Sequence, residues 1–205
     1  MKRLSRILIF SLAGLALGFL PAVAQHRDGH RLRDRIQAWE RDMEEFRARS
    51  DQRRHLRYLA DSLAGVQAYA AIQNQDFVLE AESVSFRTGP VVFVNSATNF
   101  ISIKGNRAVV QIAPNAFPAG PNGLGGVTVE GVISARELRR SRSGKVAFSF
   151  NVVGIGINAQ VEIYLNADSN RATATVYPNF NSNTVWMTGQ VVPYENSRVV
   201  EGNSL

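Results

Sequence analysis

The side chains able to do acid–base or nucleophilic chemistry are unevenly distributed along this chain of 205 residues. The three histidines, His26, His30 and His55, all precede residue 76, and the sequence contains no cysteine. Ser-His-Asp catalysis needs a histidine beside its nucleophile, and Cys-His catalysis needs both residues. The chain from Asp76 onward therefore lacks the parts of both constellations.

A pair of carboxylates is the acid–base option that remains in the second part of the chain. Glu80 and Glu82 are two residues apart, which on a strand places them on one face at about 7 Å. That spacing is compatible with an inverting glycosidase pair, but alternation of polar and apolar residues is also ordinary for a strand. We expect a protein that is not an enzyme. The alternative is a carboxylate-dependent hydrolase of an envelope glycan, resting on Glu80, Glu82, Glu130 and Glu162.

Two of the histidines have a spacing that metal sites use. His26 and His30 are four residues apart, which places two imidazoles on one face of a helix. No third ligand lies near them in the sequence, and a solvated N-terminal segment accounts for both. We predict no metal site and no cofactor.

Two loop segments have unusual compositions, 119–126 with its glycines and 177–184 with its asparagines. A phosphate-binding P-loop needs Gly-Lys-Ser/Thr at the start of a helix, whereas a strand-like run, 127–131, follows the glycines. Loops on a rigid scaffold often carry function, although packed structural connections and turns explain both segments as well. We predict ligand or partner binding here, a carbohydrate among the ligands considered. The candidate residues are Asn122, Gly123, Gly125, Gly126, Tyr177, Asn179, Phe180, Asn181, Asn183 and Trp186.

Residues 1–24 predict a cleavable secretory signal peptide. Lys2, Arg3 and Arg6 precede an apolar stretch of about fourteen residues, and Ala22-Val23-Ala24 supplies the small-x-small pattern of a cleavage site. A membrane-spanning helix needs about 20 apolar residues, so we expect cleavage near Ala24 and no stable membrane anchor. Without cysteine the protein cannot be a lipoprotein lipidated on that residue or carry disulfides. We expect a periplasmic or secreted protein.

Loss of the signal peptide also changes the charge. The formal net charge falls from +6 to +3, because three basic residues and no acidic residue leave. The remaining arginines sit among acidic residues, whereas nucleic-acid-binding proteins concentrate basic residues on one face. We therefore expect no nucleic-acid partner.

Residues 25–75 form a charged segment with helical periodicity. Two groups of apolar residues recur at steps of three and four, and the second does not continue the phase of the first. This pattern predicts two amphipathic helices, or one long helix with two separate contact faces. We expect these faces to pack on the β domain or to associate with another copy of the chain. Residues 25–62 would form the contact between copies. The groups are Leu32, Ile36, Trp39, Met43 and Phe46, and then Leu56, Leu59, Leu63, Val66 and Ala70.

The period changes to two in residues 76–205, which predicts antiparallel sheet. Turn residues such as Lys104-Gly105-Asn106 and Ala167-Asp168-Ser169-Asn170 separate about eight to ten strands. Short connections predict a β-meander that closes as a barrel, lipocalin-like among the options, or folds over as a sandwich. Small residues at inward positions allow tight packing or leave room for a ligand. They are Ala108, Gly131, Ala159, Ala172 and Ala174.

A set of short motifs runs through residues 65–205. The motifs are Asn74-Gln75-Asp76-Phe77-Val78-Leu79-Glu80-Ala81, Val94-Asn95-Ser96, Thr98-Asn99-Phe100-Ile101, Val109-Val110-Gln111-Ile112, Gly120-Pro121-Asn122-Gly123, Gly125-Gly126, Thr128-Val129-Glu130-Gly131, Pro178-Asn179-Phe180-Asn181-Ser182-Asn183 and Gly202-Asn203-Ser204-Leu205. In these motifs the chain resembles the domain of unknown function 4251 family, small exported proteins found mainly in Bacteroidota. The resemblance covers residues 65–205 and implies an exported, β-rich protein, with no activity or site to transfer.

The sequence as a whole predicts an exported, non-catalytic envelope protein. We expect a ligand- or partner-binding β module whose partner is an envelope ligand or protein. A structural protein that self-associates is a further alternative.

Overall fold

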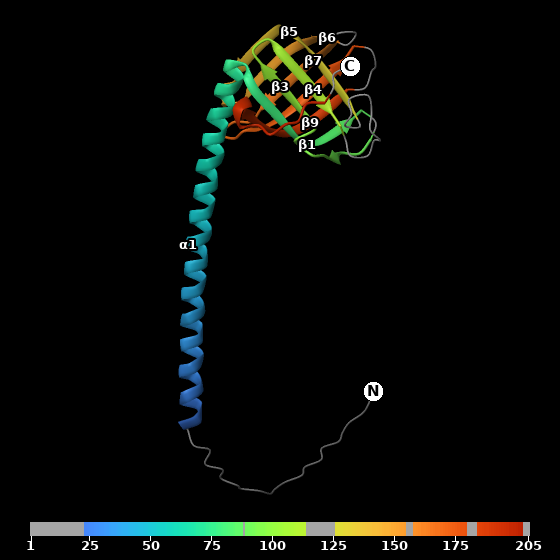
Figure 1. Ribbon diagram of the computed structural model, residues 1–205. Coiled ribbons are helices and arrows are strands. Elements are labelled where there is room, and N and C mark those ends of the chain that lie inside the picture. The colour runs from blue at the N-terminus through green and yellow to red at the C-terminus, as the bar shows by residue number, and fades with distance from the viewer. Residues whose placement is uncertain (1–22, 88, 114–125, 155–157, 180–183, 203–205) are drawn as a thin grey trace, which may run out of the picture. The chain divides into compact units, whose positions relative to one another are not determined.

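The computed structural model describes residues 23–87, 89–113, 126–154, 158–179 and 184–202, with side chains from Arg31 onward (Figure 1). It divides into two compact units, residues 1–52 and residues 53–205. We call the second the β unit. The elements are α1 (Val23–Asn74), β1 (Asp76–Phe86), β2 (Val92–Phe93), β3 (Phe100–Lys104), β4 (Arg107–Ile112), β5 (Val127–Arg140), β6 (Val146–Gly154), β7 (Asn158–Leu165), β8 (Arg171–Pro178), β9 (Val185–Pro193) and the 3-10 helix η1 (Tyr194–Asn196).

The first element, α1, is a single helix of 52 residues, so the one-helix form of the prediction is correct. Its residues are mostly strong helix formers, and no proline interrupts them. The helix ends where Gln75 adopts a left-handed conformation (φ 55°) and its N–H donates to the carbonyl oxygen of Ile72 at 3.1 Å. This is a common way for a helix to stop. No helix formed by the described residues is long and apolar enough to cross a membrane.

The strands form a closed antiparallel β-barrel, as predicted, and the barrel rather than the sandwich is correct. Neighbours in the sheet follow the order β1, β3, β4 and on to β9, and β9 pairs back onto β1. Eight strands thus close a barrel that is lipocalin-like in shape. The two-residue strand β2 pairs with β1 beyond the residues that pair with β3.

Tight turns and bulges let the sheet curl, and among the described residues the register shifts both in β1 against β9 and in β5 against β6. Gly105 (φ 61°) and Asp168 (φ 56°) have positive φ angles in the two turns named above, and Gly144 (φ 83°) has one in the turn between β5 and β6. The register of β1 against β9 shifts between Ala81 and Ser83. Opposite this bulge, a Cβ on Gly189 would run into the carbonyl oxygen of Glu80. A bulge adds local twist, which helps a strand bend around a barrel.

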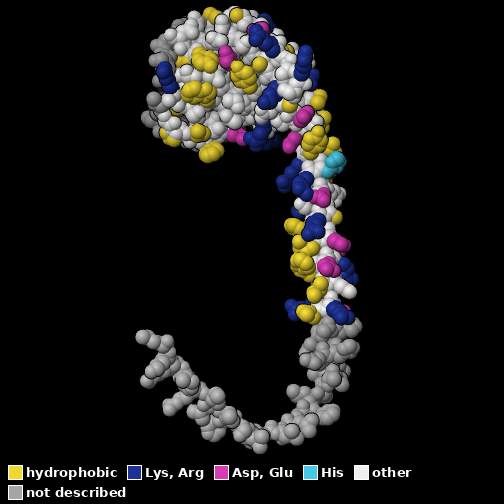
Figure 2. All heavy atoms as spheres, turned by 180° about the vertical axis from the view of Figure 1, so that it is seen from behind, with side chains coloured by type: hydrophobic (Ala, Val, Ile, Leu, Met, Phe, Trp, Pro, Cys, Tyr) yellow, Lys and Arg dark blue, Asp and Glu magenta, His cyan; other side chains and the backbone are white. Residues whose placement is uncertain are grey.

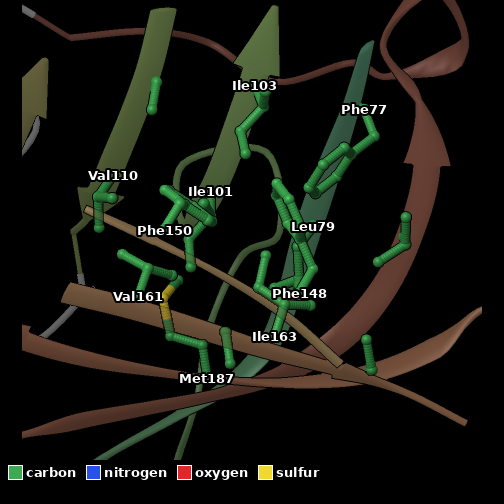
Figure 3. Close-up of a cluster of buried hydrophobic side chains, with 14 of the residues drawn as sticks. Phe77, Leu79, Ile101, Ile103, Val110, Phe148, Phe150, Val161, Ile163 and Met187 are labelled. Atoms are coloured by element: carbon green, nitrogen blue, oxygen red, sulfur yellow. The ribbon is translucent and has the colours of Figure 1, made fainter. Parts of the chain in front are cut away.

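The barrel interior is filled with hydrophobic side chains (Figure 3). Phe77 on β1 and Phe148 on β6 come from opposite walls, four strands apart in the closed order. Their ring centroids nevertheless lie 6.1 Å apart in an edge-on arrangement, and Phe150 stacks beside Phe148 at 5.2 Å. The small inward residues therefore serve packing, since large side chains from the facing strands occupy the space. Of these small residues, Ala108, Ala159, Ala172 and Ala174 belong to the buried cluster.

The last turns of α1 pack on one end of the barrel. Ala68 and Ile72 are buried in the same cluster as the barrel interior. Gly65 approaches the β7–β8 turn so closely that a Cβ would lie 2.7 Å from the backbone nitrogen of Ser169. The packing face thus combines the small residues Gly65 and Ala68 with Ile72, whereas the predicted stripe on this part of the helix, which includes Leu63 and Val66, is exposed.

A C-terminal strap, residues 194–202, covers part of the outer barrel wall. Val78, Phe100 and Val109 form a second buried cluster outside the barrel, and Tyr194 and Val199 of the strap pack on it. The strap is held by backbone contacts as well, because Val200 N–H donates to the carbonyl oxygen of Ala97 at 2.8 Å. It therefore supplies the cover that these three apolar side chains need on the outside of the sheet.

Candidate recognition surface

The described residues include four of the ten predicted binding residues. Gly126, Tyr177, Asn179 and Trp186 are described, whereas the other six lie outside the described residues. Those six are Asn122, Gly123, Gly125, Phe180, Asn181 and Asn183.

The two predicted loops join strands at the same end of the barrel. The first connection runs between Ile112 on β4 and Val127 on β5, and the second between Pro178 on β8 and Val185 on β9. The antiparallel order places these four strand ends opposite the end on which α1 packs. We call this the distal end of the barrel. The strand ends that flank the two segments, about sixty residues apart in the sequence, thus lie at one end of the barrel.

Two of the four described candidates have structural roles. A Cβ on Gly126 would collide with the carbonyl oxygen of Ile112, so the close approach of β4 explains this glycine. The N–H of Asn179 donates to the carbonyl oxygen of Asn158 at 2.9 Å and extends the pairing of β7 with β8. Backbone geometry is sufficient to account for both residues.

The other two candidates, Tyr177 and Trp186, have side chains that remain exposed on the outer wall near the distal end. Trp186 is 37% exposed and lies in register between Thr175 on β8 and Ser85 on β1. Tyr177 is 40% exposed and occupies the next outward position after Thr175. The two rings are therefore diagonal neighbours across adjacent strands, within reach of one another's contacts.

A third aromatic side chain joins this surface from β2. Phe93 is 85% exposed and pairs with Ser83, which in turn pairs with Thr188 on β9. We call the surface formed by Phe93, Tyr177 and Trp186 the aromatic face. Serine and threonine side chains separate the rings along the register, namely Ser83, Ser85 and Thr188.

The sequence did not identify Phe93 as a candidate. Val91, Val92, Phe93 and Val94 form a continuous apolar run. Such a run is typical of a strand buried on both faces. In the fold Val92, whose partner Val84 points inward, and Val94, which packs against the interior cluster, lie on the inner side, whereas Phe93 between them points outward. Figure 2 shows several hydrophobic side chains on one side of the barrel surface, separated by polar atoms.

The first pair of candidate carboxylates, Glu80 and Glu82 on β1, forms hydrogen bonds and an ion pair with neighbouring groups. Glu80 accepts hydrogen bonds from the Ser197 hydroxyl at 2.7 Å and from the Arg198 N–H at 3.3 Å, both in the C-terminal strap. Glu82 forms an ion pair with Arg171 at 3.1 Å and accepts a bond from the amide of Gln190. Each carboxylate ties β1 to another segment.

The Glu130 carboxylate faces a cation. Arg107 on β4 contacts Glu130 on β5 at 2.5 Å and Glu201 of the strap at 2.8 Å. Hydrogen bonds to these two carboxylates, first that of Glu201, raise the pKa of Arg107 well above its usual range. A shallow hollow of about 370 Å³ lies beside the pair, and its lining includes Arg107, Glu130 and Val132. The two charged side chains that line this hollow, Arg107 and Glu130, thus form an ion pair with each other.

The fourth carboxylate, Glu162, lies on the outer face of β7. It accepts hydrogen bonds from Gln160 Nε2 and from the Tyr164 hydroxyl, both at 3.2 Å. The negative charge of Glu162 raises the pKa of Tyr164 above its ordinary value. The four carboxylates are thus distributed over β1, β5 and β7, and each contacts a different set of polar groups.

Metal ligands do not converge in the part of the chain that the structure describes. No three histidine, aspartate or glutamate side chains among those residues form a group that could hold a metal ion. The side chains of His26 and His30 lie outside this description, whereas His55 is exposed on α1. Every buried side-chain nitrogen and oxygen among the described residues has a hydrogen-bond partner.

Comparison with known proteins places the barrel in a family. The model of the family described as "Domain of unknown function (DUF4251)" matches residues 61–191. The crystal structure of a DUF4251 family protein from Bacteroides eggerthii is similar, with 44% sequence identity and a TM-score of 0.61. The match covers 68% of this chain and 94% of the Bacteroides chain. No curated protein matches. The family match spans more than half of the sequence, and this chain therefore belongs to the DUF4251 family, as the resemblance over residues 65–205 predicted; the closing motif Gly202-Asn203-Ser204-Leu205 lies beyond the matched residues.

Proposed function

We propose that the protein is an exported, non-catalytic binding module of the cell envelope that recognises an extended carbohydrate with its aromatic face. The observation that carries the proposal is the aromatic face itself. Phe93, Tyr177 and Trp186 expose ring surface on one wall, with small hydroxyl side chains between them. Sugar rings present apolar C–H faces that stack on such rings, and hydroxyl groups that bond to serine and threonine.

The filled interior favours recognition on the surface. Lipocalin-like barrels that hold a small ligand keep an internal space for it. Here the Phe77 and Phe148 rings meet from opposite walls. A lipophilic ligand inside the barrel would have to displace them.

The partnered carboxylates favour a binding role over hydrolysis. An inverting glycosidase needs one carboxyl group free to donate a proton and another free to activate water. Glu80 and Glu82 instead bond to Ser197, Arg171 and Gln190. Export of the module rests on the signal-like residues 1–24.

The test is affinity electrophoresis of the protein in native gels that contain dextran, xylan, mannan or soluble peptidoglycan. We expect at least one polymer to slow migration, and Trp186→Ala and Phe93→Ala each to reduce the effect. Tyr58→Ala is the control, because Tyr58 is an exposed tyrosine that lies on α1 and not on the strands that carry the aromatic face. The proposal would be contradicted if no polymer slowed the migration of the protein. It would also be contradicted if the control substitution reduced the slowing as much as Trp186→Ala and Phe93→Ala do.

A further inference from the structure

The N-terminal part of α1 carries an exposed apolar stripe. Leu32, Ile36, Trp39 and Phe46 lie on it, and Trp39 and Phe46 are 63% and 58% exposed. Isolated apolar residues on a surface are normal, but a continuous line of large ones marks an interaction site. In Figure 2 hydrophobic side chains on this helix lie among arginine and acidic side chains.

The spacing of the stripe is that of a coiled-coil seam. Its members follow steps of four and three from Leu32 to Phe46, and the next step reaches Ser50. In heptad terms Ile36, Met43 and Ser50 take position a, and Leu32, Trp39 and Phe46 take position d. A mean step of 3.5 residues keeps such a stripe against a partner helix.

The charges beside the seam identify the partner. In a parallel pair, a residue at position g faces the residue five positions later, at position e, in the other helix. Arg35 would then face the second copy's Glu40, and Asp42 would face the second copy's Arg47. Both contacts join opposite charges, and symmetry repeats each of them. We propose that residues 32–50 form a parallel, in-register coiled coil with a second copy of this chain.

The antiparallel arrangement is disfavoured by the same residues. If two copies buried the same stripe in an antiparallel pair, each position g would face a position g of the other helix, and each position e would face a position e. Arg35 would meet Arg49, Asp42 would meet Asp42 and Glu40 would meet Glu40 of the second copy. Like charges at these positions are destabilising. The charge pattern therefore selects one orientation and one register.

The seam is short, which sets the expected strength. The second stripe of α1 begins at Leu56, one residue too early to continue position a at residue 57. The uninterrupted seam is therefore 19 residues long, from Leu32 to Ser50, or about 28 Å of helix. We expect association that is reversed by dilution. This inference does not depend on carbohydrate recognition, because no residue of the aromatic face takes part.

Sedimentation velocity over a range of protein concentrations tests the inference with charge-reversal variants. Glu40→Arg opposes Arg35 with a second arginine in both symmetric contacts and should weaken association about tenfold. The double variant Arg35→Glu/Glu40→Arg restores opposite charges and should restore association. Glu44→Arg, the same change at position b away from the seam, is the control. Unchanged thermal unfolding of the barrel would show that each variant is folded.

A single introduced cysteine tests orientation and register. The chain has no cysteine of its own, so Ser50→Cys can link only to the same residue of another copy. A parallel, in-register pair brings these two residues together, and a disulfide dimer should form rapidly on mild oxidation. Arg41→Cys, at position f on the far side of the helix, should not form one. Monomers at every concentration, or equal linking through both cysteines, would overturn the inference.

Discussion

The side-chain oxygen of Gln111 accepts the backbone N–H of Gly202 at 2.7 Å, which fastens the end of the C-terminal strap to the outer wall of β4. The same amide is fully buried, and its nitrogen donates to the carbonyl oxygens of Thr98 and Val200. One glutamine thus joins three segments of the chain. Because burial makes each of these bonds costly to lose, Gln111 should matter more to stability than the charged contacts around it.

Gln111→Leu should lower the free energy of unfolding by about 2–3 kcal/mol, because the strap and Thr98 lose bonds that leucine cannot replace. Urea denaturation measures the change. Glu201→Gln is the comparison, since its ion pair with Arg107 is partly exposed and should contribute less than about 1 kcal/mol. Equal losses in the two variants would contradict the ranking.

Gly65→Ala should destabilise the protein, although alanine is the better helix former by about 1 kcal/mol. The added Cβ would lie 2.7 Å from the backbone of Ser169, so the helix must shift from the barrel end. We expect a net loss of about 1–2 kcal/mol from overpacking. Gln67→Ala, an exposed change on the same turn, should stay within about 0.5 kcal/mol. A rise in melting temperature for Gly65→Ala would refute the close packing.

Tyr194 should make the strap sensitive to alkaline pH. Burial, and then the negative charge of Glu201, raises the pKa of this phenol above its ordinary value. The folded state therefore holds the proton more tightly than the unfolded state. The resulting stabilisation is complete below the unfolded pKa of about 10 and is lost as the pH rises through the folded pKa.

Urea midpoints at pH 8, 10 and 11 measure this effect. The midpoint of the parent protein should fall more steeply above pH 10 than that of Tyr194→Phe, which has no phenol to ionise. Tyr58→Phe, on the exposed surface of α1, serves as the control. Parallel curves for the parent and Tyr194→Phe would contradict the prediction.

The signal-like segment should be removed on export. We expect the periplasmic or secreted protein to begin at Gln25, as judged by mass spectrometry of its N-terminal peptide. Ala22→Arg and Ala24→Arg place a large charge in the small-x-small pattern and should leave the longer precursor in the membrane fraction. A protein that retains Met1 in the cytoplasm would contradict both cleavage and export.

Much of the fold was predictable because burial follows period two so regularly. Phe148, Phe150 and Val152 alternate with polar residues in the sequence, and all three are buried in the barrel interior. The choice between a barrel and a sandwich was not predictable. It depends on the pairing of β1 with β9, whose partner residues are 99 to 116 positions apart, and no local pattern encodes such a pairing.

The helix and the candidate site show where local patterns fail. The stripe from Leu56 to Ala70 was the obvious contact face, yet the barrel packs on Gly65 and Ala68. Small residues allow the helix to approach the barrel closely, and a search for large apolar residues at helical spacing does not detect them. Likewise, Phe93 looked like a core residue, and only the two-residue length of β2 and its place at the edge explain its exposure.

The pairing of β1 with β9 has a consequence for how the chain is made. Synthesis and any transport through a membrane pore proceed from the N-terminus, so β1 emerges before the other strands and its partner β9 emerges after them. The barrel cannot close until Val185–Pro193 is available, and the strap that follows can dock only after that. Until β9 has emerged, the barrel stays open and the chain can still be threaded through a pore, so pairing of β1 with β9 is a late step that docking of the strap follows.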